Sequence, residues 1–176
     1  MAPYFEKFEP REHPRVCFLG LGNINYSDDG FGVRLAGELA RGGMPNVIIA
    51  GTAPEQYLGQ VAAQDYDSLV FLDAVNFGGL PGSLVVLGAQ QIQMRFPQIS
   101  THKISLAVLT KLVQSMGRTK VWLLGVQPES IREGRSMTPI VQATLELIKE
   151  LLLDGYSCEE ILEPAKQFQE MEEHVC

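Results

Sequence analysis

The segment Val16–Ala36 reads VCFLGLGNINYSDDGFGVRLA and contains an apolar run, a glycine-rich stretch and a second periodic pattern. An unbroken apolar run such as Val16–Leu19 is typical of a strand that is covered on both faces. Gly20 and Gly22 let the backbone turn sharply and approach other atoms closely. From Phe31 onward apolar residues recur at helical spacing. The segment therefore predicts a strand–turn–helix unit of an open α/β sheet, in which sites lie beyond the strand.

Two adjacent aspartates, Asp28 and Asp29, precede this helix. The glycine pattern does not complete a dinucleotide fingerprint, because Asn25 stands where the third glycine belongs, and no Gly-Lys-Ser/Thr follows to make a P-loop. One aspartate is enough to cap a helix. The other aspartate then has either a structural role or a functional one, in which it binds a metal or transfers a proton.

The remaining elements alternate between strand and helix patterns. Strands are expected at residues 46–50, 68–74, 83–87 and 119–126, and helices at 55–63, 104–116 and 139–153, with an irregular stretch at 88–103. The short GGLPG connection at 78–82 suggests that strands 68–74 and 83–87 form an antiparallel hairpin. The pattern predicts a three-layer α/β/α sandwich with a mostly parallel twisted sheet and one antiparallel strand.

Length and composition are those of a single domain, 1–176, with a net charge of -7. We expect an irregular N-terminal arm at 1–14, the α/β core at 15–155 and an acidic tail at 156–176. The acidic balance argues against a nucleic-acid surface, and no apolar run reaches membrane-spanning length. The N-terminus lacks the apolar segment of a signal peptide, and the three cysteines contain no C-x-x-C motif. These features favour a cytoplasmic protein with reduced thiols.

Three side chains are candidates for a common site. Asp73 ends the strand 68–74, and the carboxyl ends of parallel strands meet at one edge, where the loop carrying Asp29 also lies. His102 lies in a polar stretch before a helix. The alternatives to a common site are that Asp73 caps a neighbouring loop and that His102 is an ordinary surface residue. Two carboxylates and an imidazole with open positions suit nickel, zinc or manganese.

Five motifs together resemble those of the hydrogenase maturation proteases, most closely the type that serves the formate-hydrogenlyase hydrogenase (hydrogenase-3). They are, in order, GLGNINYSDDGFGVR (20–34), AGTAPEQYL (50–58), VFLDAV (70–75), ISTHKISL (99–106) and LLGVQPESIREGRSMTP (123–139). The resemblance covers residues 16–153, and the AGTAPE segment points to the hydrogenase-3 type. It implies a protease that removes the C-terminal extension of a [NiFe]-hydrogenase large-subunit precursor already loaded with nickel.

By this resemblance Asp29, Asp73 and His102 are the metal ligands, and Asp29 and Asp73 are also catalytic. The metal is nickel presented by the precursor, which zinc or cadmium would replace in vitro, and the protease is expected to be a monomer. The segment Gly51, Thr52, Ala53, Pro54 and Glu55 is a candidate for substrate binding, because rigid Pro/Gly loops hold a peptide at low entropic cost. Two alternatives stay open: a non-enzymatic nickel-binding checkpoint for the precursor, and a self-contained metallohydrolase on the same fold.

Overall fold

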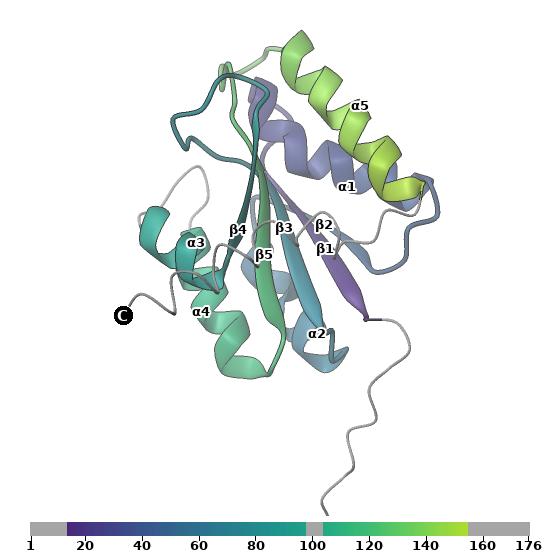
Figure 1. Ribbon diagram of the computed structural model, residues 1–176, viewed down its shortest axis with the longest axis vertical. Helices are drawn as coiled ribbons and strands as arrows, with labels where there is room; N and C mark the ends of the chain where they lie inside the picture. The colour runs from purple at the N-terminus through teal and green to yellow at the C-terminus, as the bar shows by residue number, and fades with distance from the viewer. Residues whose placement is uncertain (1–13, 98–103, 155–176) are drawn as a thin grey trace, which may run out of the picture.

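The computed structural model describes residues 14–97 and 104–154, and within these ranges the chain forms a sheet between two layers of helices (Figure 1). The strands are β1 (Val16–Leu21), β2 (Val47–Gly51), β3 (Ser68–Ala74), β4 (Leu84–Gly88) and β5 (Lys120–Val126). The helices are α1 (Phe31–Arg41), α2 (Leu58–Ala63), α3 (Ala89–Arg95), α4 (Leu106–Met116) and α5 (Pro139–Leu153), with 3₁₀ turns η1 (Ser27–Gly30) and η2 (Pro54–Tyr57).

The five strands are arranged in the order β2-β1-β3-β5-β4. All neighbouring pairs are parallel except β4 with β5, which confirms the predicted sandwich with one antiparallel strand. The expected hairpin is wrong, however, because β5 lies between β3 and β4. The β3–β4 loop (residues 75–83) crosses the end of β5 and bonds to it at both of its own ends: the Val75 N–H donates to the Val126 carbonyl, and the Gln127 N–H donates to the Ser83 carbonyl (2.9 Å each).

Side chains of the central strands alternate between two separate apolar cores, which explains their unbroken apolar sequence. In β3, Leu69 and Phe71 pack on the face covered by α2, α3 and α4, whereas Val70 and Leu72 pack on the face covered by α1 and α5. Figure 1 shows α1 and α5 together on one side of the sheet and the other three helices on the opposite side. The carboxyl ends of the four parallel strands all point to one edge, called the carboxyl edge below.

Helix α3 lies inside the stretch that we expected to be irregular. Its sequence, AQQIQMR, has little apolar periodicity, and Ile92 is its buried residue. The helix starts where the Gly88 N–H donates to the Gln91 side chain (3.1 Å), and it packs against α4. Tertiary packing of one apolar side chain therefore produces a helix from a segment whose own pattern is too polar to predict one.

Two glycines allow the strand–turn–helix unit at β1 to pack tightly. Gly22 has a φ of 116°, and a Cβ there would lie 1.8 Å from the carbonyl oxygen of Asp29. A Cβ on Gly32 would lie 1.9 Å from the Leu72 carbonyl oxygen. Only glycine lets the start of α1 approach the ends of β1 and β3 this closely. Within the described ranges, every helix is too short or too polar to cross a lipid bilayer.

Candidate active site

Asp29 and Asp73 lie at the carboxyl edge, where the adjacent parallel strands β1 and β3 end. Asp29 is in η1, which follows β1 and contacts β3, and Asp73 is the last residue but one of β3. Each is 1% exposed. The Asn23 N–H donates to Asp29 Oδ2 (2.7 Å), and the Ala74 N–H donates to Asp73 Oδ1 (2.9 Å). The fold thus holds two buried, hydrogen-bonded carboxyl groups at the edge where α/β sheets place their sites.

Asp28, the neighbour of Asp29, has a structural role. It is fully buried, and its two oxygens accept four hydrogen bonds from the β5–α5 loop (residues 127–138). The donors are the N–H groups of Glu129 and Ser130 (2.9 Å each) and the N–H and hydroxyl of Thr138 (2.7 and 3.0 Å). Neither aspartate caps η1 or α1 through its side chain, so the expected cap is wrong: Asp28 anchors a distant loop instead.

Further contacts fasten the same loop to the turn after β1. The Ser27 hydroxyl donates to the Ser136 carbonyl (2.8 Å), and the Gly134 N–H donates to the Asn25 carbonyl (2.8 Å). The Asp28 N–H donates to the Ser130 carbonyl (3.0 Å). A loop of this length that is held at several points is usually functional. It forms one wall of the carboxyl edge, next to the turn that carries Asp29.

Gln127 organises the loop that follows Asp73. Only 8% of this residue is exposed, and its side-chain oxygen accepts hydrogen bonds from three successive N–H groups, those of Phe77, Gly78 and Gly79 (3.0–3.2 Å). Its amide nitrogen donates to the side chain of Asn76 (3.2 Å). One buried amide therefore shapes the chain immediately beyond Asp73. Its sequence signals are its place directly after a buried strand and within the motif of residues 123–139, neither of which predicts this role.

The segment Gly51–Glu55 lies beside the turn after β1, because the Gly22 N–H donates to the Gly51 carbonyl (3.1 Å). Pro54 is buried, and it is the first residue of η2. The Oε2 atom of Glu55 is buried, and it has no hydrogen-bond partner among the described residues. The segment proposed for substrate binding is thus part of the same edge as Asp29 and Asp73.

His102, the third expected ligand, lies outside the described residues. Within 14–97 and 104–154, no three His, Cys, Asp or Glu side chains come close enough together to hold a metal ion. Asp29 and Asp73 provide only carboxyl oxygens, so a bound metal would take its further ligands from elsewhere. Oxygen donors of this kind accept nickel, zinc or manganese when an imidazole completes the set.

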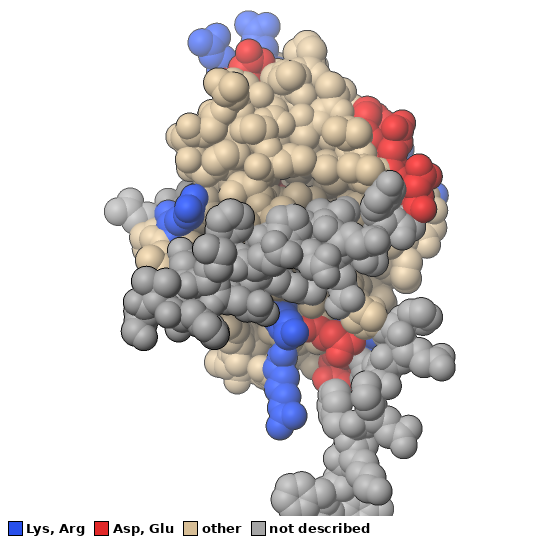
Figure 2. All heavy atoms as spheres, in the orientation of Figure 1, with Lys and Arg blue, Asp and Glu red and all other residues tan. Residues whose placement is uncertain are grey.

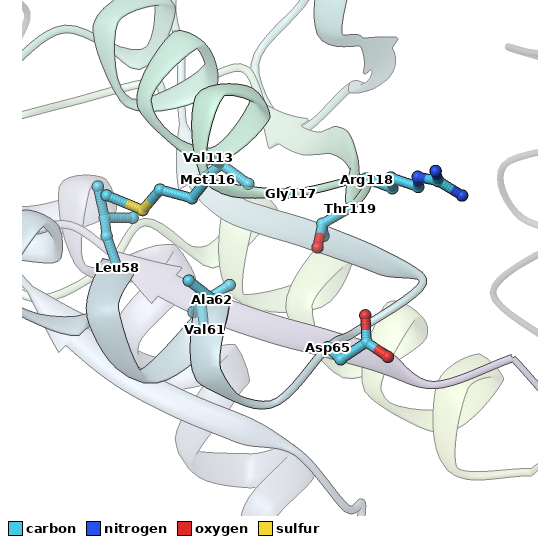
Figure 3. A pocket seen from close by; sticks show the side chains of 9 residues that line it. All are labelled: Leu58, Val61, Ala62, Asp65, Val113, Met116, Gly117, Arg118 and Thr119. Atoms are coloured by element: carbon cyan, nitrogen blue, oxygen red, sulfur yellow. The ribbon is translucent and has the colours of Figure 1, made fainter. Parts of the chain in front are cut away.

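Two hollows lie on opposite edges of the sheet. One, of about 550 Å³ including open solvent, lies at the carboxyl edge between the β3–β4 loop and the end of α3 and is lined by Asn76, Phe77, Arg95 and Phe96. The other, of about 390 Å³ including open solvent, lies at the amino ends of β3 and β5 (Figure 3) and is lined by Leu58, Val61, Ala62, Asp65, Val113, Met116, Gly117, Arg118 and Thr119. In Figure 3 Met116 extends toward Leu58, and the Arg118 side chain points away from the cavity.

Charged side chains of the described residues are scattered in small groups on the face shown in Figure 2, without a continuous basic patch. This agrees with the net charge of -7.

Comparison with known proteins identifies the family. The HycI family model, described as hydrogenase maturation protease, matches residues 33–155. The hydrogenase 2 maturation protease of Escherichia coli (strain K12) is 33% identical over 147 residues, which are 79% of this chain and 88% of that protein. The crystal structure of a [NiFe] hydrogenase maturation protease HycI from Thermococcus kodakarensis KOD1 superimposes with a TM-score of 0.72 at 28% identity, covering 80% and 91% of the two chains. A crystal structure of the hydrogenase 3 maturation protease gives a TM-score of 0.69 at 27% identity, covering 79% and 89%.

The chain therefore belongs to the hydrogenase maturation protease family, as the motifs predicted. Its sheet, its helical layers and the two buried carboxyl groups at the carboxyl edge are the features from which we infer its function below.

Proposed function

We propose that this protein is an endopeptidase that removes the C-terminal extension of a [NiFe]-hydrogenase large-subunit precursor once the precursor holds nickel. Membership of the family supports the reaction class. The observation that carries the proposal is the burial of two carboxyl groups at the carboxyl edge, Asp29 in the turn η1 and Asp73 near the end of β3, which η1 contacts. Each carboxyl group accepts a backbone hydrogen bond, and two carboxylates held at one edge of the sheet favour the binding of a cation there, which nickel carried by the substrate would supply.

In the proposed mechanism Asp29, Asp73 and His102 bind the nickel of the precursor and so place the scissile peptide bond at the carboxyl edge. The Asn23 and Ala74 N–H groups orient the two carboxyl groups by hydrogen bonds to one oxygen of each. Nickel bound by these residues would supply a Lewis acid for the peptide carbonyl or the attacking water. One of the two carboxylates accepts a proton from that water as general base and passes it to the nitrogen of the leaving amine, and the C–N bond breaks to release the extension.

This arrangement makes cleavage depend on nickel loading. Without the cation the carboxylates at the edge repel each other, and the precursor has no group that they bind. Zinc or cadmium would occupy the same ligands in vitro. The segment Gly51–Glu55 binds the precursor beside the metal. We further propose that the protein acts as a monomer in the cytoplasm and pairs only transiently with its substrate.

The intact mass of a large-subunit precursor, incubated with this protein with and without nickel loading, tests the proposal. We expect loss of one C-terminal peptide from the nickel-loaded precursor only. Asp73→Asn should abolish the loss and leave the fold intact, while Asp154→Asn, a change at an exposed residue after α5, should cleave at the wild-type rate. Cleavage at the wild-type rate by Asp73→Asn would refute the metal-site mechanism. Binding of a precursor that a known maturation protease cuts, without any change in its mass, would instead indicate a checkpoint protein.

A further inference from the structure

The carboxyl group of Glu55 is an exception to how buried polar atoms are normally arranged. Its Oε2 atom is buried, and it accepts no hydrogen bond from the described residues. Nearly all buried polar atoms in folded proteins have such a partner, because leaving one unsatisfied costs about 1–3 kcal/mol. An atom kept in this condition calls for an explanation beyond the stability of the fold.

Local structure does not supply the missing partner. Glu55 is in the first turn of η2, where a carboxyl group commonly accepts hydrogen bonds from free N–H groups of its own turn, yet its Oε2 atom accepts none from the described residues. The preceding residue, Pro54, has no N–H to donate. Glu55 is also the only charged residue between positions 47 and 64, the stretch that contains β2, η2 and α2. This unit therefore contains no cation of its own that could pair with Glu55.

The position of Glu55 places this unsatisfied oxygen close to the proposed site. It follows Gly51, whose carbonyl accepts the Gly22 N–H in the turn that carries Asp29. Helix α2, which η2 begins, packs on the sheet face where Leu69 and Phe71 of β3 point. Asp73 is the next residue in that alternation, so it faces the same side of the sheet as η2.

We propose that Glu55 is a substrate-binding residue whose carboxylate receives a positively charged side chain of the precursor, next to the peptide bond that is cut. The inference rests on the proposed endopeptidase function and adds the chemistry of one subsite. A carboxylate offers only acceptors, so its partner is an N–H donor. A cationic donor is favoured over a neutral one, because charge-assisted hydrogen bonds are roughly twice as strong and offset the loss of hydration at the buried Oε2 atom of this half-buried residue.

This subsite makes opposite predictions for stability and for activity. Changing a residue that stabilises the fold lowers the melting temperature, whereas Glu55→Gln replaces a charged carboxylate by a neutral amide of the same size and should leave the melting temperature unchanged or slightly higher. The same change removes the charge that the substrate meets, so it should raise KM and lower kcat/KM. Loss of one charge-assisted hydrogen bond corresponds to a decrease of about 10- to 100-fold in kcat/KM.

The experiment uses the nickel-loaded precursor that the wild-type protein cleaves, and the cleaved bond is first located by mass spectrometry of both products. Glu55→Gln and Glu55→Met are compared with Glu150→Gln, the same chemical change at an exposed position of α5. Each Lys, Arg or His within about three residues of the cleaved bond is then replaced by Gln in the precursor. We expect the Glu55→Gln effect on kcat/KM to disappear with one of these precursors, as in a double-mutant cycle.

The proposal fails if wild type cleaves the precursor but Glu55→Gln changes kcat/KM by less than threefold. It also fails if no basic residue lies near the cleaved bond, or if Glu55→Gln has the same effect with every precursor variant. A loss of several degrees in melting temperature for both Glu55 variants would assign the residue to the fold instead. Failure of the wild-type protein to cleave any precursor would refute the proposed function itself, which keeps the two failures distinct.

Discussion

Adjacent aspartates with different roles give the sharpest test of this structure, and the informative change is Asp28→Asn. All four contacts of Asp28 come from donors, so both oxygens act as acceptors, the role of an ionised carboxylate. An asparagine has one acceptor oxygen and one NH₂ group. Whichever way the amide is turned, its NH₂ group faces at least one N–H of Glu129, Ser130 or Thr138, and two donors cannot bond to each other.

The magnitude follows from these contacts. An unsatisfied buried donor costs about 1–3 kcal/mol, and the remaining bonds weaken because hydrogen bonds to a charged group contribute about 1.5–3 kcal/mol against about 1 kcal/mol for neutral ones. Together the free energy of unfolding should fall by about 3–5 kcal/mol. Since small domains have about 5–15 kcal/mol in total, this is a large share. The melting temperature should drop by roughly 10 °C.

Urea unfolding followed by tryptophan fluorescence measures this loss directly. The chain has a single tryptophan, Trp122, which lies in β5 with 4% exposure and reports on the core. Asp29→Asn is the matched control, because the oxygen of asparagine can still accept the hydrogen bond from the Asn23 N–H. We expect this variant to lose less than about 1 kcal/mol and to lose cleavage altogether.

Equal losses of unfolding free energy for the two variants would refute the assignment of separate roles. So would a loss below about 1 kcal/mol for Asp28→Asn, because that value would mean that the β5–α5 loop does not depend on the Asp28 carboxylate.

Two further predictions concern buried groups away from the aspartates. Gln127→Leu removes the shared acceptor of three N–H groups at residues 77–79, so hydrogen exchange of these amides should become at least tenfold faster, whereas Gln142→Leu, a change on the exposed face of α5, should leave it unaltered. Burial raises the pKa of the Cys17 thiol from 9.0 to about 12, so the folded state keeps a proton that the unfolded chain releases. The contribution of this thiol to the free energy of unfolding is complete below pH 9 and is lost as the pH rises toward 12, by up to about 1.4 kcal/mol per pH unit. In urea unfolding, the free energy of unfolding of Cys17→Ala should therefore fall less steeply with rising pH than that of the wild type. Unchanged exchange or identical slopes would contradict these two predictions.

Local pattern was sufficient where one segment determines its own structure. The apolar runs of β1, β3 and β5 predicted buried strands, and their alternation with helical patterns predicted the layers. Pro139 was expected at the start of the last helix and is its first residue. Parallel topology alone places the residues that follow β1 and β3 at one edge, so Asp29 and Asp73 were identifiable as neighbours before the structure was known.

Contacts between distant segments decided the rest. No property of Asp28 or Asp29 in the sequence tells which of them bonds to a loop a hundred residues away. The insertion of β5 between β3 and β4 depends on its parallel pairing with β3 and its antiparallel pairing with β4, which join segments far apart in the chain. Helix α3 depends on one isoleucine that becomes buried only when α4 packs against it.

The amino-acid sequence by itself determined the class of fold, the family and the edge at which the two carboxyl groups lie, because periodicity and motif order are local properties of the chain. Only the tertiary structure decided which aspartate anchors a loop, which strand pairs with β4, and that one oxygen of Glu55 has no hydrogen-bond partner among residues 14–97 and 104–154. These depend on burial and on directed hydrogen bonds across long separations, and the free energy of both is set by neighbours that the chain brings together only when it folds.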